Sequence, residues 1–263
     1  MERKLSNEYI KEVLKNINPR VRKFFGNMIE LHTGIDPAKA NGLNLRGSID
    51  FLKHVWGICL DWGNQRMDYI DRSVQQLDDF LTSFNSENEI HNLDIFLKKL
   101  EGHWDRLLSI KPNTSGSQDE VRRLTELLTD FHSVRIKTAA LIMRFICLDC
   151  NFFEIDKSKL IPPLDRVNYR MCEQLLGRKY ILEKLGNIRG TFSEEATMTF
   201  NNIGKNILGE DKILIDNLWF VGHFYHDGTN CQIRESAKII EFPYLRQIDL
   251  LESCPFLEYG CER

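Results

Sequence analysis

Hydrophobic residues recur along most of the chain at intervals of three and four positions, which places them on one face of an α-helix. Alternating hydrophobic and polar positions, the pattern of a β-strand, are nearly absent. The pattern therefore predicts an all-α fold. The predicted helices cover residues 7–16, 19–32, 48–61, 65–83, 88–109, 121–128, 137–149, 166–176, 179–186, 193–206 and 212–225.

Three segments interrupt this helical pattern. Residues 33–47 are rich in Gly, Asn and Pro, and residues 111–118 read as a linker. Residues 156–165 contain Pro162-Pro163, which prevents a helix and predicts an extended segment. Two sequences have the form of a capping box at a helix start, Ser117 to Glu120 and Thr191 to Glu194.

Composition narrows the class of protein. A chain of 263 residues with 42% hydrophobic content can bury a large core, and its net charge of −3 argues against a purely electrostatic nucleic-acid binder. No segment has eighteen uninterrupted apolar residues, and the first residues are charged, so we expect neither membrane insertion nor secretion. Seven scattered cysteines do not form a disulfide pattern and predict a reducing, cytoplasmic location.

Lys137 is the most unusual residue in the pattern, because it is a cation at the start of an almost wholly apolar helix. A helix N-terminus carries roughly +0.5 of an elementary charge, which disfavours a second positive charge. Together with burial, this is expected to lower the pKa of the amine and to produce a nucleophile. The alternative is a lysine whose ammonium group simply reaches water from the end of a core helix.

The order of parts around Lys137 resembles that of the helix-hairpin-helix DNA glycosylase superfamily. A helix, a short turn and a second helix that opens with Lys137-Thr-Ala are followed by an extended segment, Ile161-Pro-Pro-Leu-Asp165-Arg-Val. Within the superfamily these motifs are most similar to the archaeal 8-oxoguanine DNA glycosylase branch, which the segment Asp216 to Gly222 also resembles. The specific likeness covers about 60 residues.

The resemblance implies a fold, a partner and two catalytic residues. It implies a two-lobed helical protein with its active site in the cleft, one lobe being residues 116–189 and the other residues 1–115 with 190–263. DNA would be the partner of a monomeric enzyme. Lys137 would attack the sugar C1′, displace the base and form a Schiff base that allows strand cleavage. Asp165, at a helix start, would stabilise the charge that develops on the sugar, although an ordinary N-cap is the alternative.

The chain departs from the family in its hairpin, which contains no glycine. Family hairpins use glycines so that backbone amides can approach a DNA phosphate. We therefore expect phosphate contacts from side chains of the turn or of the helix that follows Asp165. The candidates are His132, Ser133, Arg135, Arg166 and Arg170.

The cysteines near the C-terminus do not match the four-cysteine iron–sulfur loop of many relatives. Cys254 and Cys261 are seven residues apart, and Cys231 lies far upstream, which leaves fewer than four ligands. We therefore predict no cluster, no metal and no cofactor. Cys147-x-x-Cys150 lies in the apolar helix and is expected to pack in the core.

Base recognition would require an aromatic ring and an amide edge next to an extruded nucleotide. The aromatic candidates are Trp62, Phe131 and Trp219, and the amide candidates are Asn64 and Gln65, which follow Trp62. Core packing is the alternative for each aromatic ring.

The sequence thus favours a DNA glycosylase with lyase activity on an oxidised or otherwise modified base. A second hypothesis keeps the chemistry but assigns it to a bulky modified base in phage or other foreign DNA. A third hypothesis is a non-catalytic helical DNA-binding protein on the same scaffold.

Overall fold

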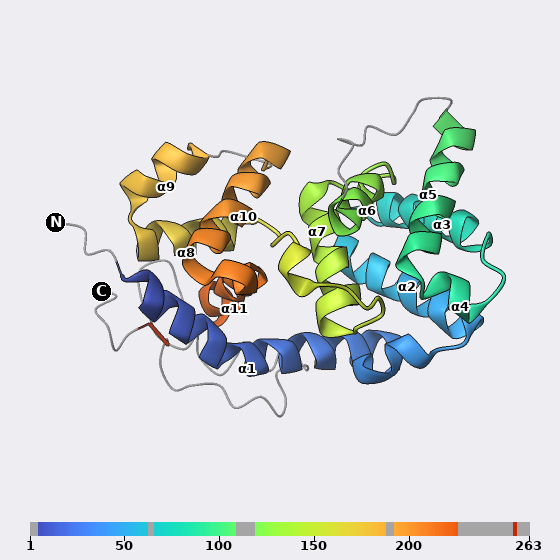
Figure 1. The fold of residues 1–263 in the computed structure, drawn as a ribbon, viewed down its shortest axis with the longest axis horizontal. Coiled ribbons are helices and arrows are strands. Elements are labelled where there is room, and N and C mark those ends of the chain that lie inside the picture. Colours follow the sequence, from blue (N-terminus) through green and yellow to red (C-terminus); the bar gives the residue numbers. More distant parts are fainter. Residues whose placement is uncertain (1–4, 63–65, 109–118, 188–191, 226–254, 257–263) are drawn as a thin grey trace. The chain divides into compact units, whose positions relative to one another are not determined.

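The computed structural model describes residues 5–62, 66–108, 119–187, 192–225 and 255–256. Every regular element within these ranges is helical, which confirms the all-α prediction (Figure 1). The chain divides into two compact units. Unit 1 comprises residues 1–27 and 162–263, and unit 2 comprises residues 28–161. These boundaries differ from the predicted lobes, because α6 and α7 belong to unit 2 whereas α8 and α9 belong to unit 1.

The first helix, α1 (Asn7–Thr33), crosses the boundary between the units. The remaining elements of unit 2 are η1 (Pro37–Gly42), α2 (Leu45–Asp61), α3 (Met67–Leu81), α4 (Glu87–Ile90), α5 (Leu93–Leu108), α6 (Glu120–Leu128), α7 (Ile136–Met143), η2 (Arg144–Asp149) and η3 (Lys157–Lys159). Those of unit 1 are α8 (Arg166–Leu176), α9 (Arg178–Leu185), α10 (Glu194–Leu208), η4 (Gly209–Asp216) and α11 (Asn217–Phe224).

Helix α1 runs without interruption through Pro19, although the sequence predicted two helices with a break before this residue. Proline lacks an N–H and normally breaks or kinks a helix. Here the side chain of Asn217 donates to the carbonyl of Leu14 (3.1 Å) and to Oδ1 of Asn18 (3.2 Å). A donor from elsewhere in unit 1 thus hydrogen-bonds the turn that precedes the proline.

Unit 1 has an aromatic core in which α11 packs on the first part of α1. The ring of Phe24 contacts those of Phe220 (5.5 Å between centroids) and Phe224 (5.3 Å). Helices α11 and α8 approach closely at Gly222, where a Cβ would overlap Cγ1 of Val167 and lie 2.8 Å from Cγ of Met171. Glycine at this position therefore sets how closely the two helices can pack.

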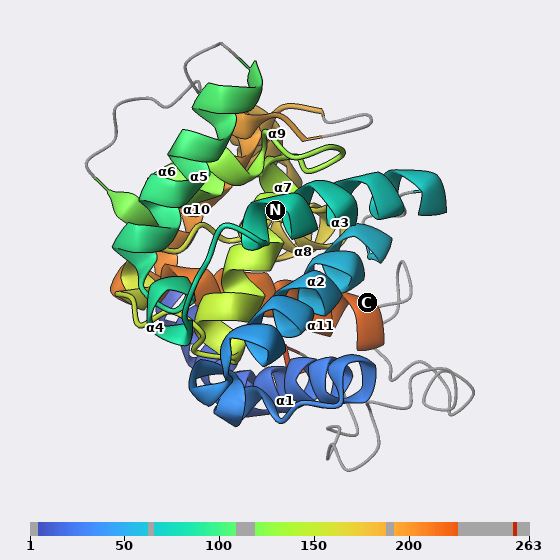
Figure 2. The same cartoon turned by 90° about the vertical axis from the view of Figure 1, so that its right-hand side faces the viewer.

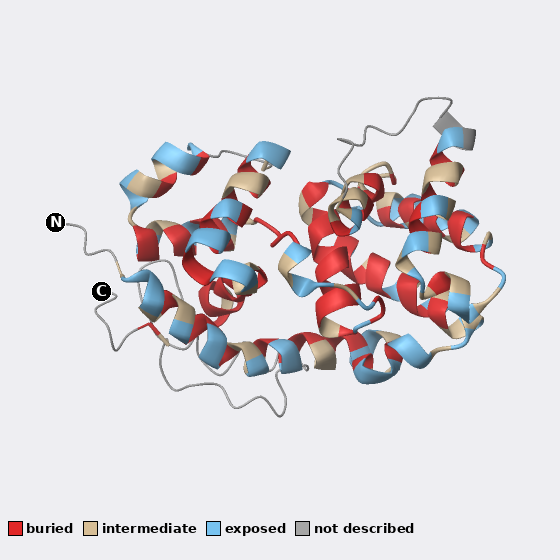
Figure 3. Cartoon of the chain, viewed as in Figure 1, coloured by how far each residue is buried: buried red, intermediate tan, exposed pale blue. Residues whose placement is uncertain are grey.

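Unit 2 has its core around α2 and α7. Figure 2 shows α2 beside α3, and Figure 3 shows α7 buried along almost its whole length. All residues of α7 except Lys137 are buried. A second aromatic cluster surrounds Phe131, whose ring contacts Trp56 (4.8 Å) and Trp104 (4.7 Å) edge to face. The apolar periodicity of these helices thus corresponds to a single packed interior.

Helix α7 changes to a π-helical turn, η2, where the sequence predicted a regular helix to residue 149. The N–H of Cys150 donates to the carbonyl of Phe145, five residues earlier (2.9 Å). This widened turn carries a buried ion pair, in which Nε of Arg144 lies 3.5 Å from Oδ2 of Asp149. Each of these side chains is 1% exposed. Residues five apart are neighbours in a π turn, so the local winding brings the two charges together.

Two helix starts lie downstream of the predicted capping boxes. Asp119 caps α6, and Ser193 caps α10 by accepting from the N–H of Ala196 (3.1 Å). Ser117 and Thr191, the predicted caps, lie outside the described residues, as does the predicted linker at 111–118. In both cases the capping residue therefore lies two positions further along the chain than predicted. None of the helices in the described ranges is long and apolar enough to cross a membrane.

The close approach at Gly222 predicts that Gly222→Ala destabilises the protein by about 1–3 kcal/mol, because the added methyl overpacks the α8–α11 contact. Urea unfolding would measure the effect. Gly57→Ala is the matched control, since a Cβ at this other helical glycine meets nothing within 4 Å. Alanine is the better helix former by about 1 kcal/mol, so the control should be neutral or stabilising. Equal effects of the two substitutions would contradict this account of the packing.

The buried ion pair predicts a strongly non-additive response to mutation. Asp149→Ala should lower the free energy of unfolding by about 3–5 kcal/mol, because it leaves the charge of Arg144 in the core. Combining Arg144→Met with Asp149→Leu removes both charges and should recover most of that loss. A double variant no more stable than Asp149→Ala in the same unfolding assay would show that the charge is not the cause.

Candidate active site

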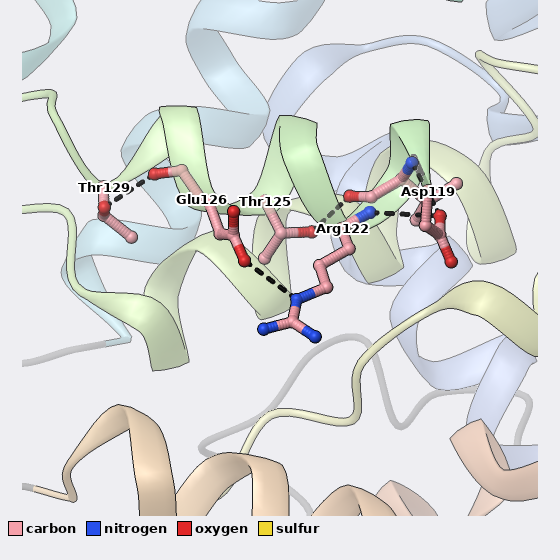
Figure 4. A network of polar contacts seen from close by, with 6 residues as sticks. Asp119, Arg122, Thr125, Glu126 and Thr129 are labelled. Carbon is pink, nitrogen blue, oxygen red and sulfur yellow. Dashed lines mark hydrogen bonds and ion pairs between the residues drawn. The ribbon is translucent and has the colours of Figure 1, made fainter. Parts of the chain in front are cut away.

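The predicted hairpin is formed by α6, a turn over residues 129–135, and α7. Polar contacts along α6 define its two ends (Figure 4). Oδ1 of Asp119 accepts from the N–H groups of Val121 (3.1 Å) and Arg122 (3.3 Å). At the other end, the hydroxyl of Thr129 donates to the carbonyl of Glu126 (2.6 Å). These contacts satisfy donors and acceptors at the helix ends and fix where the turn begins.

The turn contains a left-handed residue although it contains no glycine. Ser133 has a φ of 62°, in the region that favours glycine. The backbone N–H of His132 donates to Oε1 of Gln76 on α3 (2.7 Å), and the His132 ring lies edge-on to that of Tyr69 (5.3 Å). Contacts with α3 therefore hold the turn in a conformation that its sequence alone would not favour.

Phe131 was predicted to bind a base, but the structure places it in the core. Its side chain is 2% exposed and is enclosed by Trp56 and Trp104. An extruded base could reach this ring only if the aromatic cluster opened. The prediction was wrong because periodicity marks an aromatic side chain as inward-facing without showing whether packing or a cavity surrounds it.

Lys137 is the second residue of α7, in the first turn as predicted. It is half-buried, whereas its neighbours Ile136 and Thr138 are buried. The N-cap residue, Arg135, makes no side-chain hydrogen bond to cap the helix. The amine is thus carried by a helix whose remaining residues are locked in the core of unit 2.

Asp165 is the N-cap of α8 in unit 1. Its Oδ1 accepts from the N–H of Asn168 (2.8 Å), and the carboxylate is half-buried. The residues before it, Pro162 to Leu164, are buried and belong to no helix. The proline segment therefore brings the chain to a helix start where the backbone N–H and the helix dipole favour an ionised carboxylate.

A buried polar network lies behind Asp165 and was not predicted. The carboxamide of Asn168 donates to the carbonyl of Pro163 (3.0 Å) and to Oδ1 of Asp216 (2.7 Å). Asn168 is 1% exposed and Asp216 is 4% exposed. A buried carboxylate thus orients the amide that joins the proline segment to α8. The sequence does place an asparagine three residues after a capping aspartate. At that position its backbone N–H donates to the aspartate side chain.

The predicted DNA-contacting residues divide between the units. Arg135 is exposed, and His132 and Ser133 are half-buried, in the hairpin of unit 2. Arg166 and Arg170 are exposed one turn apart on α8 of unit 1. Each cluster therefore presents polar or cationic groups beside one of the two proposed catalytic residues.

The two predicted base-binding tryptophans are both half-buried. Trp62 follows α2 in unit 2 and contacts the ring of Phe145 edge to face (6.3 Å). Trp219 lies in α11 of unit 1 and stacks on His223 (4.8 Å, 8° between planes). Asn64 and Gln65 lie outside the described residues.

The described cysteines are buried thiols that form no disulfide. Cys147 and Cys150 lie in the core of unit 2 as predicted, and burial raises the pKa of the Cys147 thiol. Burial likewise raises the pKa of Cys172 to about 12. Cys231, Cys254 and Cys261 lie outside the described residues. Among the described residues, no group of three or more His, Cys, Asp or Glu is arranged to hold a metal ion.

Comparison with known proteins adds no relative. No protein-family model, no curated protein and no solved structure matches this chain.

The burial of Asp130, in the hairpin turn, leads us to predict that the thermal stability of the protein depends on pH. Partial burial raises the pKa of its carboxyl, because desolvation disfavours the charged form. At low pH the group is protonated in both folded and unfolded chains and has no effect. As the pH rises through the raised folded-state pKa, the cost of the desolvated charge develops in the folded state. Asp130→Asn should therefore raise Tm at neutral pH, and the gain should shrink as the pH falls through that pKa.

Thermal melts over a pH series would measure this difference. Asp105→Asn, at an exposed position on α5, is the control and should show no such pH dependence. A Tm difference between Asp130→Asn and the wild type that is constant with pH would contradict the assignment.

Proposed function

We propose that this protein is a DNA glycosylase with associated lyase activity, acting on an oxidised or otherwise modified base. The proposal depends on the position of Lys137. This lysine lies in the first turn of a buried apolar helix, directly after the hairpin turn. The proline segment that ends at the helix-capping Asp165 supplies the second part. Both match the order of parts in helix-hairpin-helix glycosylases.

In the proposed reaction the neutral amine of Lys137 attacks C1′ of the target nucleotide. The bond between C1′ and the base breaks, and the base leaves with the electron pair and takes up a proton. Loss of a proton from the attacking nitrogen and opening of the sugar ring leave a Schiff base. Removal of a proton from C2′ then expels the 3′ phosphate and cleaves the strand. Asp165 would act electrostatically, stabilising the positive charge on the sugar as the base departs.

The remaining predicted residues have supporting roles in this scheme. Arg135, His132 and Ser133 of the hairpin and Arg166 and Arg170 of α8 would bind phosphates, which position the strand without reading its sequence. Trp62 and Trp219 stay candidates for stacking on the extruded base. Phe131 has no such role, because it is enclosed in the core.

Borohydride reduction tests the covalent step. Incubation with DNA containing a modified base, followed by borohydride, should trap the protein on the strand. Lys137→Ala should reduce trapping by about a hundredfold or more, because no other amine replaces the nucleophile. The control is Lys159→Ala, which removes an exposed lysine of η3 and should trap normally. Asp165→Asn should slow base release by about 10²–10³ while retaining the cap acceptor.

Three outcomes would change this assignment. Undiminished trapping by Lys137→Ala would overturn the role of Lys137. Base excision without strand cleavage by Lys137→Gln would indicate a monofunctional enzyme in which water is the nucleophile and Asp165 the principal catalyst. Tight DNA binding that is unaffected by changes at both residues, with no abasic product, would identify a non-catalytic DNA-binding protein.

A further inference from the structure

One residue in the first turn of α8, Asn168, is hydrogen-bonded both to Asp165 and to the segment that leads to it. Pro162 and Pro163 lack a backbone N–H, so their backbones can form hydrogen bonds only through their carbonyl groups. The carbonyl of Pro163 accepts from Nδ2 of Asn168 (3.0 Å). The backbone N–H of Asn168 donates to Oδ1 of Asp165 (2.8 Å). Asn168 therefore holds the carboxylate and the chain two residues before it at the same time.

The carboxylate of Asp216 fixes the orientation of the Asn168 amide. Nδ2 carries two N–H donors, and the second of them reaches Oδ1 of Asp216 at 2.7 Å. A rotation that exchanged Nδ2 and Oδ1 would turn the amide oxygen toward two other acceptors. Helices α8 and α11, which pack closely at Gly222, are thus also joined by a hydrogen bond near their N-terminal ends.

This polar pair is not what stability alone would select. Asn168 is 1% exposed, and its Oδ1 accepts from no group in the described part of the chain. Asp216 is 4% exposed, so its carboxylate is desolvated as well. Two apolar side chains of similar shape would pack at this place without needing any partner. Polar groups that are kept in a core against this preference are typical of sites where geometry serves function.

We propose that Asn168 is a positioning residue for Asp165 and that Asp216 acts through Asn168. The amide fixes the chain on both sides of Leu164, and the carboxylate of Asp165 is thereby held where positive charge develops on the sugar. Asn168 is buried and is not itself a catalytic residue. This inference rests on the proposed function for the reaction, but the hydrogen bonds that it invokes can be measured without DNA.

Asn217 offers a matched control for this role. Its side chain is also 1% exposed, and its amide donates to one carbonyl and one side-chain oxygen, those of Leu14 and Asn18. Its Oδ1, like that of Asn168, is buried and accepts from no group within the described ranges. These contacts hold α1 and not the segment before Asp165. Loss of either amide should destabilise the fold to a similar extent, whereas only loss of the Asn168 amide should affect Asp165.

Amide hydrogen exchange tests the positioning directly. Asn168→Ala keeps the backbone N–H at position 168, which donates to Asp165, but removes the side chain that holds the preceding segment. After correction for the intrinsic rate of each residue type, this N–H should exchange about tenfold or more faster than in the wild type. In Asn217→Ala it should exchange at the wild-type rate. Unchanged exchange at position 168 in Asn168→Ala would overturn the proposal, whether or not the protein is a glycosylase.

Single-turnover base release tests the consequence for catalysis. On DNA whose modified base the wild type releases, Asn168→Ala should slow release by about 10- to 100-fold, because a displaced catalytic group costs up to about 10² in rate. Asn217→Ala should release the base at the wild-type rate, and both variants should bind the DNA with unchanged affinity. Adding Asn168→Ala to Asp165→Asn should slow release no further, since Asn168 acts through that carboxylate.

Two variants of Asp216 keep the test decisive if Asn168→Ala folds poorly. Asp216→Asn retains an oxygen that can accept from the Asn168 amide, so most of the wild-type rate of base release should remain. Asp216→Ala removes this acceptor and should slow release by about tenfold or more. Equal rates for these two variants would overturn the proposal.

The two measurements separate this proposal from the glycosylase assignment. A wild type that releases no base from any modified DNA, with faster exchange at position 168 in Asn168→Ala alone, would sink the glycosylase and support the positioning of Asp165. Base release by the wild type that is equally fast in Asn168→Ala would support the glycosylase and overturn the role of Asn168. Slower release together with faster exchange, in Asn168→Ala but not in Asn217→Ala, would support both.

Discussion

Two opposite charges in the interior of unit 2 constrain the structure around them. Arg144 and Asp149 are almost completely buried, and either charge left alone there would cost several kcal/mol. They are five residues apart, and the π-helical turn η2 brings residues at that spacing together. Every helix that packs on this turn must therefore accommodate a fixed, widened segment. The pair thus anchors the continuation of α7 in the core.

The position of Lys137 follows from that anchoring. The seven other residues of α7 are buried, so the helix cannot rotate or slide without exposing apolar surface. The hairpin turn is held from the other side by the hydrogen bond from His132 to Gln76. The half-buried amine of Lys137 thus lies at the junction of two packed parts, which restrict where it can move.

Two helical glycines have opposite effects on the packing around them. At Gly222 there is no room for a methyl group, and the absent side chain allows α8 and α11 to approach. At Gly57 the space is open, and the absent side chain leaves a cavity. Both glycines lie within apolar helical patterns, so the sequence does not distinguish them. Only neighbours from other helices decide whether a missing Cβ means contact or cavity.

The sequence by itself determined the all-α class, the approximate span of most helices, and the placement of Lys137 and Asp165 at helix starts. These features depend on periodicity, proline and capping, which act over a few residues. The structure shows that α1 continues through Pro19, and Asn217, from a distant segment, donates to the turn before this proline. Tertiary structure also decided that Phe131 is enclosed and that Asn168 and Asp216 are paired. Side-chain burial and hydrogen bonding depend on partners far away in the chain, and no local pattern specifies those partners.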